Sequence, residues 1–188
     1  FRKSLFIRID WRNWRVILIR AFAELASTML FLNALAQMPL ANVSAILQSL
    51  PLTVTMFAAM FFGEAVGWRR WSAILVGFIG VLIIIRPGSD GFNEYAVLAL
   101  IAVGFITLRD AITRRLARSV PSLFVAFVSA IPVFLFGGAM TVTTGWTPVS
   151  WSMGIIVTVA AISITCGYLF AVMAMRIGDI SFVAPFRY

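Results

Sequence analysis

Glu24 is the side chain whose position most strongly suggests chemistry. It lies near the middle of an apolar stretch, residues 14–36, which is long enough to cross a bilayer as a helix. A carboxylate at that depth costs about 2.5–3.5 kcal/mol even on insertion scales, so it is usually paired or functional. Arg20 precedes it by one helical turn. Two interpretations stay open: Glu24 contacts a substrate or proton, or Arg20 and Glu24 form a purely structural charge pair.

Three hydrogen-bonding side chains recur in the next apolar stretch, residues 40–62. Ser44, Gln48 and Thr55, with Pro51 between the last two, have spacings that place them on one helical face. Such a face is poorly matched to lipid and is expected against another helix or a wet cavity. Pro51 is expected to permit a kink. Lining of a cavity and polar contact between helices both remain open for this group.

Polar groups also occur near the end of the chain. Arg187 lies within an apolar segment, where it needs either an acidic partner such as Glu24 or an anionic group of a substrate. Ser181 and Tyr188 lie on the same expected helix as Arg187. The complete set of predicted substrate-binding residues is Glu24, Thr28, Ser44, Gln48, Thr55, Thr165, Tyr168, Ser181, Arg187 and Tyr188.

Several classes of site are disfavoured by the residue types present. The chain has no histidine and one cysteine, Cys166, so zinc sites of the Cys/His type and nucleophile–histidine pairs are excluded. We therefore expect no metal, no cofactor and no enzymatic activity. Charges near expected helix ends, including Arg109, Asp110 and Arg114, are interpreted as structural, with Asp110 and Arg114 as an i, i+4 pair.

The elements that must position these residues are membrane-spanning helices. The chain is 62% hydrophobic and only 12% charged, with a mean hydropathy of +1.01, whereas soluble domains usually carry about 25% charged residues. The apolar stretches predict an all-α polytopic bundle with helices at 14–36, 40–62, 71–85, 95–113, 121–140 and 151–175, and the start of another at 179. The chain starts at Phe1 without an initiator Met, inside a basic segment, and stops at Tyr188 inside an apolar one, so we expect an internal part of a longer protein.

The basic residues predict the orientation of these helices. Twelve Lys and Arg residues fall at one set of alternating ends, and only Arg86 falls at the other. Because cytoplasmic loops are enriched in Lys and Arg, the Phe1 end and the loops 63–70, 114–120 and 176–178 are predicted to be cytoplasmic. The net charge of +8 therefore reflects membrane topology, and no nucleic-acid partner is expected. The twelve residues are Arg2, Lys3, Arg8, Arg12, Arg15, Arg69, Arg70, Arg109, Arg114, Arg115, Arg118 and Arg176.

A weak internal repeat connects the two ends of the chain. An offset of 137 residues aligns residues 14–51 with 151–188 without a gap, and pairs Thr28 with Thr165 and Ser44 with Ser181. Five helices separate the two copies, so the second copy would be inverted in the membrane. Inverted repeats are typical of secondary transporters with a midplane site. A duplicated bundle without transport activity is the alternative.

Several motifs resemble the EamA-type members of the drug/metabolite transporter superfamily. They are residues 61–64 with the following 68–71, the Gly-rich segment 77–81, residues 86–88, and the segments 39–42 and 185–188. The resemblance implies ten helices in two inverted five-helix repeats. Residues 1–88 would be the C-terminal part of the first repeat, with a cytoplasmic basic loop and three transmembrane helices. Residues 89–188 would be the second repeat, truncated in its fourth helix.

The family resemblance implies a secondary transporter of a bacterial inner membrane. Its substrate would be a small polar or amphiphilic metabolite, such as an amino acid, amine, vitamin or nucleotide-like compound, bound between the helices at 14–36, 40–62, 151–175 and 179 onward. Arg20, Arg187 and Glu24 leave one surplus positive charge, which favours an anionic or zwitterionic substrate. Proton coupling through Glu24, sodium coupling and exchange all remain open. The alternative is a membrane-embedded enzyme or a non-transporting assembly subunit.

Overall fold

The computed structural model is an all-α bundle whose helices are long and apolar. It describes residues 10–63, 66–85, 94–117, 119–146 and 148–177. Within these ranges, five helical segments have the length and hydropathy to cross a membrane: Trp11–Gln37, Leu40–Phe62, Glu94–Thr113, Ser122–Thr144 and Trp151–Ala174. The prediction of a polytopic helical membrane protein is therefore confirmed.

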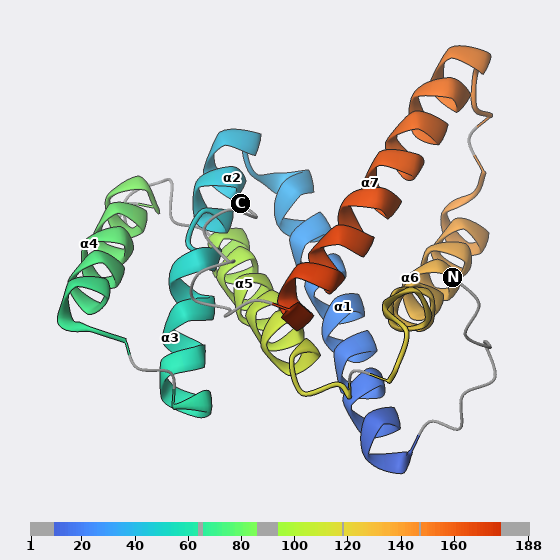
Figure 1. Cartoon of the computed structure of the whole chain (residues 1–188). Coiled ribbons are helices and arrows are strands. Elements are labelled where there is room, and N and C mark those ends of the chain that lie inside the picture. Colours follow the sequence, from blue (N-terminus) through green and yellow to red (C-terminus); the bar gives the residue numbers. More distant parts are fainter. Residues whose placement is uncertain (1–9, 64–65, 86–93, 118, 147, 178–188) are drawn as a thin grey trace.

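Two long helices form the centre of the bundle. α1 (Trp11–Gln37) and α5 (Glu94–Thr113) lie side by side, and their contact is the most extensive between any two described elements (Figure 1). Small side chains allow the close approach: Ala96, Ala99 and Ala102 are buried on α5, and Ala23 and Ser27 are buried on α1. Small residues at such contacts are the usual means of packing helices tightly in membranes.

The predicted helix at 40–62 is divided into two. α2 (Leu40–Leu47) and α3 (Leu50–Phe62) are separated at Gln48 and Ser49. Pro51 has no N–H to donate to the carbonyl four residues earlier, so the helical ladder is interrupted just before it. The Ser49 hydroxyl donates a hydrogen bond of 2.6 Å to the Ile46 carbonyl at this break. The expected kink is present, and it interrupts the single polar face predicted for Ser44, Gln48 and Thr55.

α4 (Trp68–Ile85) packs on one side of the bundle, against α2 and α3 (Figure 1). It begins three residues earlier than the predicted helix, at Trp68. Gly77 lies against α3, where an added Cβ would overlap the Leu52 side chain, whereas Gly80 has open space around it. The Gly-rich segment 77–81 therefore makes a close contact at Gly77 and has open space at Gly80.

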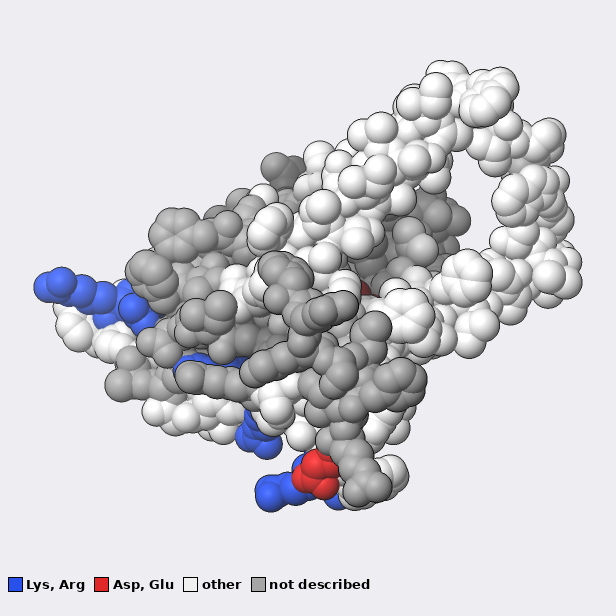
Figure 2. Space-filling model, turned by 45° about the vertical axis from the view of Figure 1, so that its right-hand side comes forward, with Lys and Arg blue, Asp and Glu red and all other residues white. Residues whose placement is uncertain are grey.

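α6 (Ser122–Thr144) and α7 (Trp151–Ile177) form a hairpin on the opposite side of α1 and α5 (Figure 1). The sequence from Ser119 to Met175 contains no Asp, Glu, Lys or Arg. Most of the large apolar side chains described on both helices are exposed, and Figure 2 shows an extensive surface without charged side chains. Such a surface suits lipid or further helices.

The chain's last eleven residues, 178–188, lie outside the described ranges. The predictions for Ser181, Arg187 and Tyr188 therefore concern residues that the structure does not describe. The same holds for the overlay of residues 40–51 on 177–188, so the inverted repeat stays a prediction.

Candidate functional site

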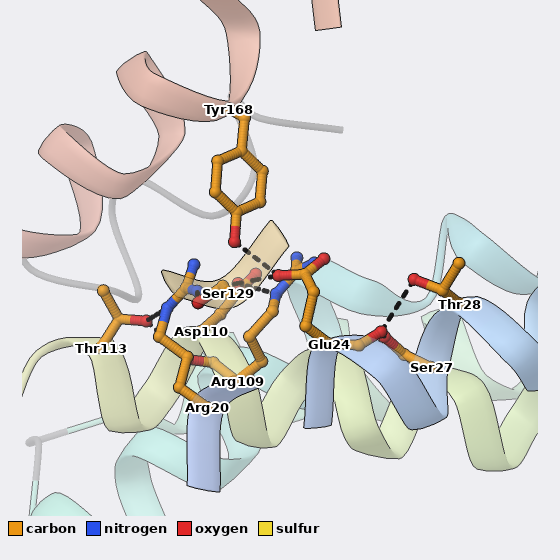
Figure 3. A network of polar contacts seen from close by, with 9 residues as sticks. All are labelled: Arg20, Glu24, Ser27, Thr28, Arg109, Asp110, Thr113, Ser129 and Tyr168. Atoms are coloured by element: carbon orange, nitrogen blue, oxygen red, sulfur yellow. Dashed lines mark hydrogen bonds and ion pairs between the residues drawn. The ribbon is translucent and has the colours of Figure 1, made fainter. Parts of the chain in front are cut away.

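Glu24 is the centre of a polar network that joins four helices. Its Oε1 accepts a hydrogen bond of 2.8 Å from Arg109 Nη1, and its Oε2 accepts one of 2.6 Å from the Tyr168 hydroxyl (Figure 3). Arg20 Nη1 lies 3.7 Å from Oε2. The carboxylate is therefore held from α5 and α7 as well as from its own helix, and its side chain is only 13% exposed.

Arg20 is buried and connects α1 with α5 and α6. Its Nε donates to Thr113 Oγ1 at 2.8 Å and its Nη1 donates to Ser129 Oγ, while its guanidinium lies 5.3 Å from the centroid of the Tyr168 ring. Only 2% of Arg20 is exposed. The predicted Arg20–Glu24 pair is present at 3.7 Å, but it is longer than the contact between Glu24 and Arg109.

Arg109 and Asp110 correct the interpretation of the α5 end. Arg109 Nε donates to Asp110 Oδ1 at 2.9 Å, and both residues are more than nine-tenths buried. They were expected to be structural charges at a helix end, with Asp110 paired to Arg114. Asp110 pairs with Arg109, and Arg109 reaches Glu24, so both belong to the buried network, while the expected Asp110–Arg114 pair stays a prediction. A charge within one turn of a helix end can point along the helix into the bundle, and spacing alone cannot distinguish that from an interfacial charge.

The described charges in this network balance. Arg20 and Arg109 supply two positive charges, while Glu24 and Asp110 supply two negative charges (Figure 3). The surplus of one positive charge expected from the sequence depended on Arg187, which lies outside the described residues, so that expectation stays a prediction. Arg109 and Asp110 add one charge of each sign to the buried set, so they leave that expected surplus unchanged.

A cavity of about 510 Å³ opens beside Glu24, between α1, α6 and α7. Four of the predicted residues line it: Glu24 and Thr28 from α1, and Thr165 and Tyr168 from α7. The remaining wall is apolar and comes mainly from α6. Its members are Leu123, Ala126, Phe127, Ala130, Val133, Phe134, Ile164 and Leu169.

The threonines contribute little free hydrogen-bonding capacity. Thr28 Oγ1 donates to the Glu24 carbonyl at 2.8 Å, and Thr165 Oγ1 donates to the Ala161 carbonyl at 2.7 Å. Their hydroxyl protons are thus used within their own helices, while their oxygens can still accept. Glu24 and Tyr168 are the principal polar groups of the cavity wall.

Ser44, Gln48 and Thr55 do not line this cavity. Ser44 and Gln48 are exposed on α2 and at the break that follows it, and Thr55 is buried on α3 with its hydroxyl donating to the Pro51 carbonyl at 2.7 Å. The predicted contribution of residues 40–62 to the cavity is replaced by α6. The side chains that α6 contributes to the cavity wall are aromatic and aliphatic. A search of the sequence for polar residues within apolar segments therefore could not identify them.

The network lies slightly to one side of the bilayer centre. Ser129 is seven residues from the start of α6 and Tyr168 nine residues from the end of α7, which corresponds to about 10–13 Å of helix. A bilayer core is about 30 Å thick, so its middle is about 15 Å from either face. The carboxylate is therefore placed somewhat nearer the end of the bundle that carries the α5–α6 connection.

Comparisons with known proteins give a consistent result. The model of the EamA-like transporter family matches residues 1–86. The chain is 28% identical over 192 residues to a riboflavin transporter of Vibrio cholerae, covering 99% of this chain and 63% of that protein. It is 27% identical over 151 residues to an S-adenosylmethionine uptake transporter of Rickettsia prowazekii, covering 80% of this chain and 51% of that protein.

A third relative is named as an exporter. The pseudopaline exporter CntI of Pseudomonas aeruginosa is 25% identical over 179 residues, which cover 92% of this chain and 61% of the relative. The chain thus spans between about half and two thirds of the length of these three proteins. No solved structure matches the chain significantly.

Proposed function

We propose that the whole protein is a secondary transporter of the EamA type in the drug/metabolite transporter superfamily, since the EamA-like family model matches residues 1–86 and the relatives are named as transporters. It moves a small polar or amphiphilic metabolite across a bacterial inner membrane by alternating access. The cavity beside Glu24 is the substrate site. Its volume of about 510 Å³ lies within the range of small-molecule pockets, about 300–1,000 Å³.

One observation carries this proposal above the others. A buried carboxylate, held by Arg109 and Tyr168, faces an aromatic and aliphatic cavity inside a bundle of membrane-spanning helices. Ionisable residues at such depth usually mark the pathway of a substrate or ion. The transporter names of the relatives support the same assignment, and they favour it over a membrane-embedded enzyme.

The packing of the helices supports alternating access. α1 and α5 form a tightly packed pair, and α2 and α3 pack against it. The more extensive contacts of α7 are with α5 and α6. α6 also packs extensively on α1, so α7 is the less tightly packed wall of the cavity, and its movement relative to the α1–α5 pair would open the cavity to each side in turn. Within the proposed ten-helix architecture, residues 1–88 belong to the first repeat and 89–188 to the second.

A transport assay tests the function directly. The whole protein, reconstituted into liposomes, is expected to accelerate the movement of at least one metabolite from a panel containing riboflavin, S-adenosylmethionine, amino acids and amines. Assays with imposed proton or sodium gradients distinguish the forms of coupling. Permeation of every compound at the rate of protein-free liposomes would contradict the proposal.

A further inference from the structure

The two carboxylate oxygens of Glu24 have different surroundings. Oε1 bonds to Arg109 on α5, and Arg109 is in turn fixed by Asp110 at 2.9 Å. These residues belong to the most extensively packed pair of helices in the described structure. The partner of Oε1 is therefore part of the rigid framework.

The close partner of Oε2 lies on α7, a helix with far fewer contacts to the rest of the bundle. Oε2 accepts the hydrogen bond from Tyr168 on α7 at 2.6 Å. Of the side chains described on α7, only Val172 is fully buried. Tyr168 lines the cavity together with Glu24, whereas neither Arg109 nor Arg20 belongs to the cavity wall. A molecule that enters the cavity therefore meets Glu24 on the side where Tyr168 is bound.

We propose that Arg109 holds Oε1 of Glu24 in place, while a hydrogen-bond donor of the substrate replaces the Tyr168 hydroxyl on Oε2. This inference rests on the proposed transport function and specifies the substrate class for the same cavity. The substrate has a flat apolar body that packs near Phe127 and Phe134, and it carries an N–H, O–H or ammonium donor at one edge.

The chemistry of the network determines this class. An ionised carboxylate only accepts hydrogen bonds, so the substrate group that contacts it must be a donor. The described charges of the network already balance, so this group can be neutral as well as cationic, and an anionic group at this edge would be repelled. Exchange of one donor for another leaves the buried carboxylate satisfied throughout, which avoids the cost of an unpaired charge.

The exchange makes an unusual prediction for Tyr168→Phe. This variant keeps the ring near Arg20 but removes the hydroxyl that competes with the substrate. Substrate then binds without displacing a hydrogen bond, so we expect an affinity about tenfold higher than that of the wild-type protein, or 1.4 kcal/mol. Tyr95→Phe, on α5 and outside the cavity wall, deletes the same atom and is expected to leave affinity unchanged.

The experiment measures equilibrium binding to the whole protein in detergent. The first probes are riboflavin, which has one imide N–H at the edge of a flat ring system, and its N3-methyl derivative, which lacks that donor. We expect the wild-type protein to prefer riboflavin about tenfold or more, and Tyr168→Phe to bind riboflavin more tightly while Tyr95→Phe does not. S-adenosylmethionine is titrated in parallel into all three proteins with the same expectation for Tyr168→Phe.

The outcomes separate the inference from the function on which it rests. Equal binding of riboflavin and its N3-methyl derivative, or weaker binding of either metabolite to Tyr168→Phe, would overturn the exchange of donors while leaving a transporter in place. The second result would make Tyr168 itself a ligand of the substrate. If neither metabolite bound to the wild-type protein and the transport panel were also negative, both proposals would fall together.

Discussion

At the scale of single residues, Arg20 shows how a charge can be stable inside a membrane protein. It is as buried as an aliphatic core residue, yet its guanidinium contacts Thr113, Ser129, Glu24 and the ring of Tyr168. Apart from Glu24, which shares α1 with Arg20, these partners come from α5, α6 and α7. A buried ion is tolerated when its partners form ion pairs or hydrogen bonds with it. Loss of one partner leaves an unpaired buried charge, which lowers the free energy of unfolding.

Replacement of Arg20 tests this account. Arg20→Met removes one of two positive charges from a balanced group of four, so we expect the free energy of unfolding to fall by about 3–5 kcal/mol. Arg15→Met makes the same change at an exposed position of the same helix and should have little effect. Thermal unfolding of both variants in detergent provides the measurement. Equal melting temperatures would show that Arg20 does not hold the network together.

Residue types in the sequence were sufficient to find half of this site. Glu24 and Tyr168 could be predicted because polar groups in apolar helices are costly and therefore informative. Arg109 and Asp110 were assigned to a helix end because they follow an apolar run and precede further arginines. They precede Thr113, where α5 ends, by only four and three residues, and spacing so close to a helix end does not distinguish a buried charge from an interfacial one. The aromatic residues of α6 carry no such signal, because apolar side chains are expected on every face of a membrane helix.

At the scale of elements, the break between α2 and α3 shows when residue spacing fails to predict which side chains share a helical face. A common face for Ser44, Gln48 and Thr55 requires one continuous helix, and Pro51 removes that continuity. The proline predicted the interruption, but its consequence for the side chains depends on how the two segments pack against α4 and α5. The other described helix ends lie within four residues of the predicted ones, because Gly, Pro and polar clusters mark them approximately.

The packing of α4 on α3 leads to a prediction for two glycines. A side chain at Gly77 would overlap Leu52, whereas one at Gly80 would enter open space. Gly77→Val is therefore expected to lower the free energy of unfolding by about 1–3 kcal/mol more than Gly80→Val does. The β-branched side chain affects helix propensity equally at both sites, so the difference between their melting temperatures reports the contact. No difference would mean that Leu52 moves aside without cost.

At the scale of the whole molecule, charge is distributed along the chain in a way that predicts orientation. Residues 119–175, which include all of α6 and most of α7, contain no charged residue, and Arg114, Arg115 and Arg118 directly precede them. We expect the α5–α6 connection to face the cytoplasm and the α6–α7 connection to face outward. The structure gives the positions of the helices relative to one another, and the distribution of arginines predicts which end of the bundle faces the cytoplasm.

Cysteine labelling tests this orientation. In a Cys166→Ser background, Ser150→Cys in the α6–α7 connection should react with an impermeant thiol reagent added to intact cells. Ser119→Cys in the α5–α6 connection should react only after the membrane is opened; both serines are exposed in the structure. The reverse pattern of labelling would invert the proposed topology.

The central claim is that the transported metabolite binds beside Glu24, and the most direct test is transport by Glu24→Gln. The amide keeps the shape of the side chain but removes the charge that accepts from Arg109 and Tyr168. Hydrogen bonds to charged groups contribute about 1.5–3 kcal/mol, so we expect the variant to lose about 10–100-fold in transport rate in proteoliposomes. Glu94→Gln, an exposed acid at the start of α5, should transport like the wild-type protein. Wild-type transport by a folded Glu24→Gln protein would contradict the claim.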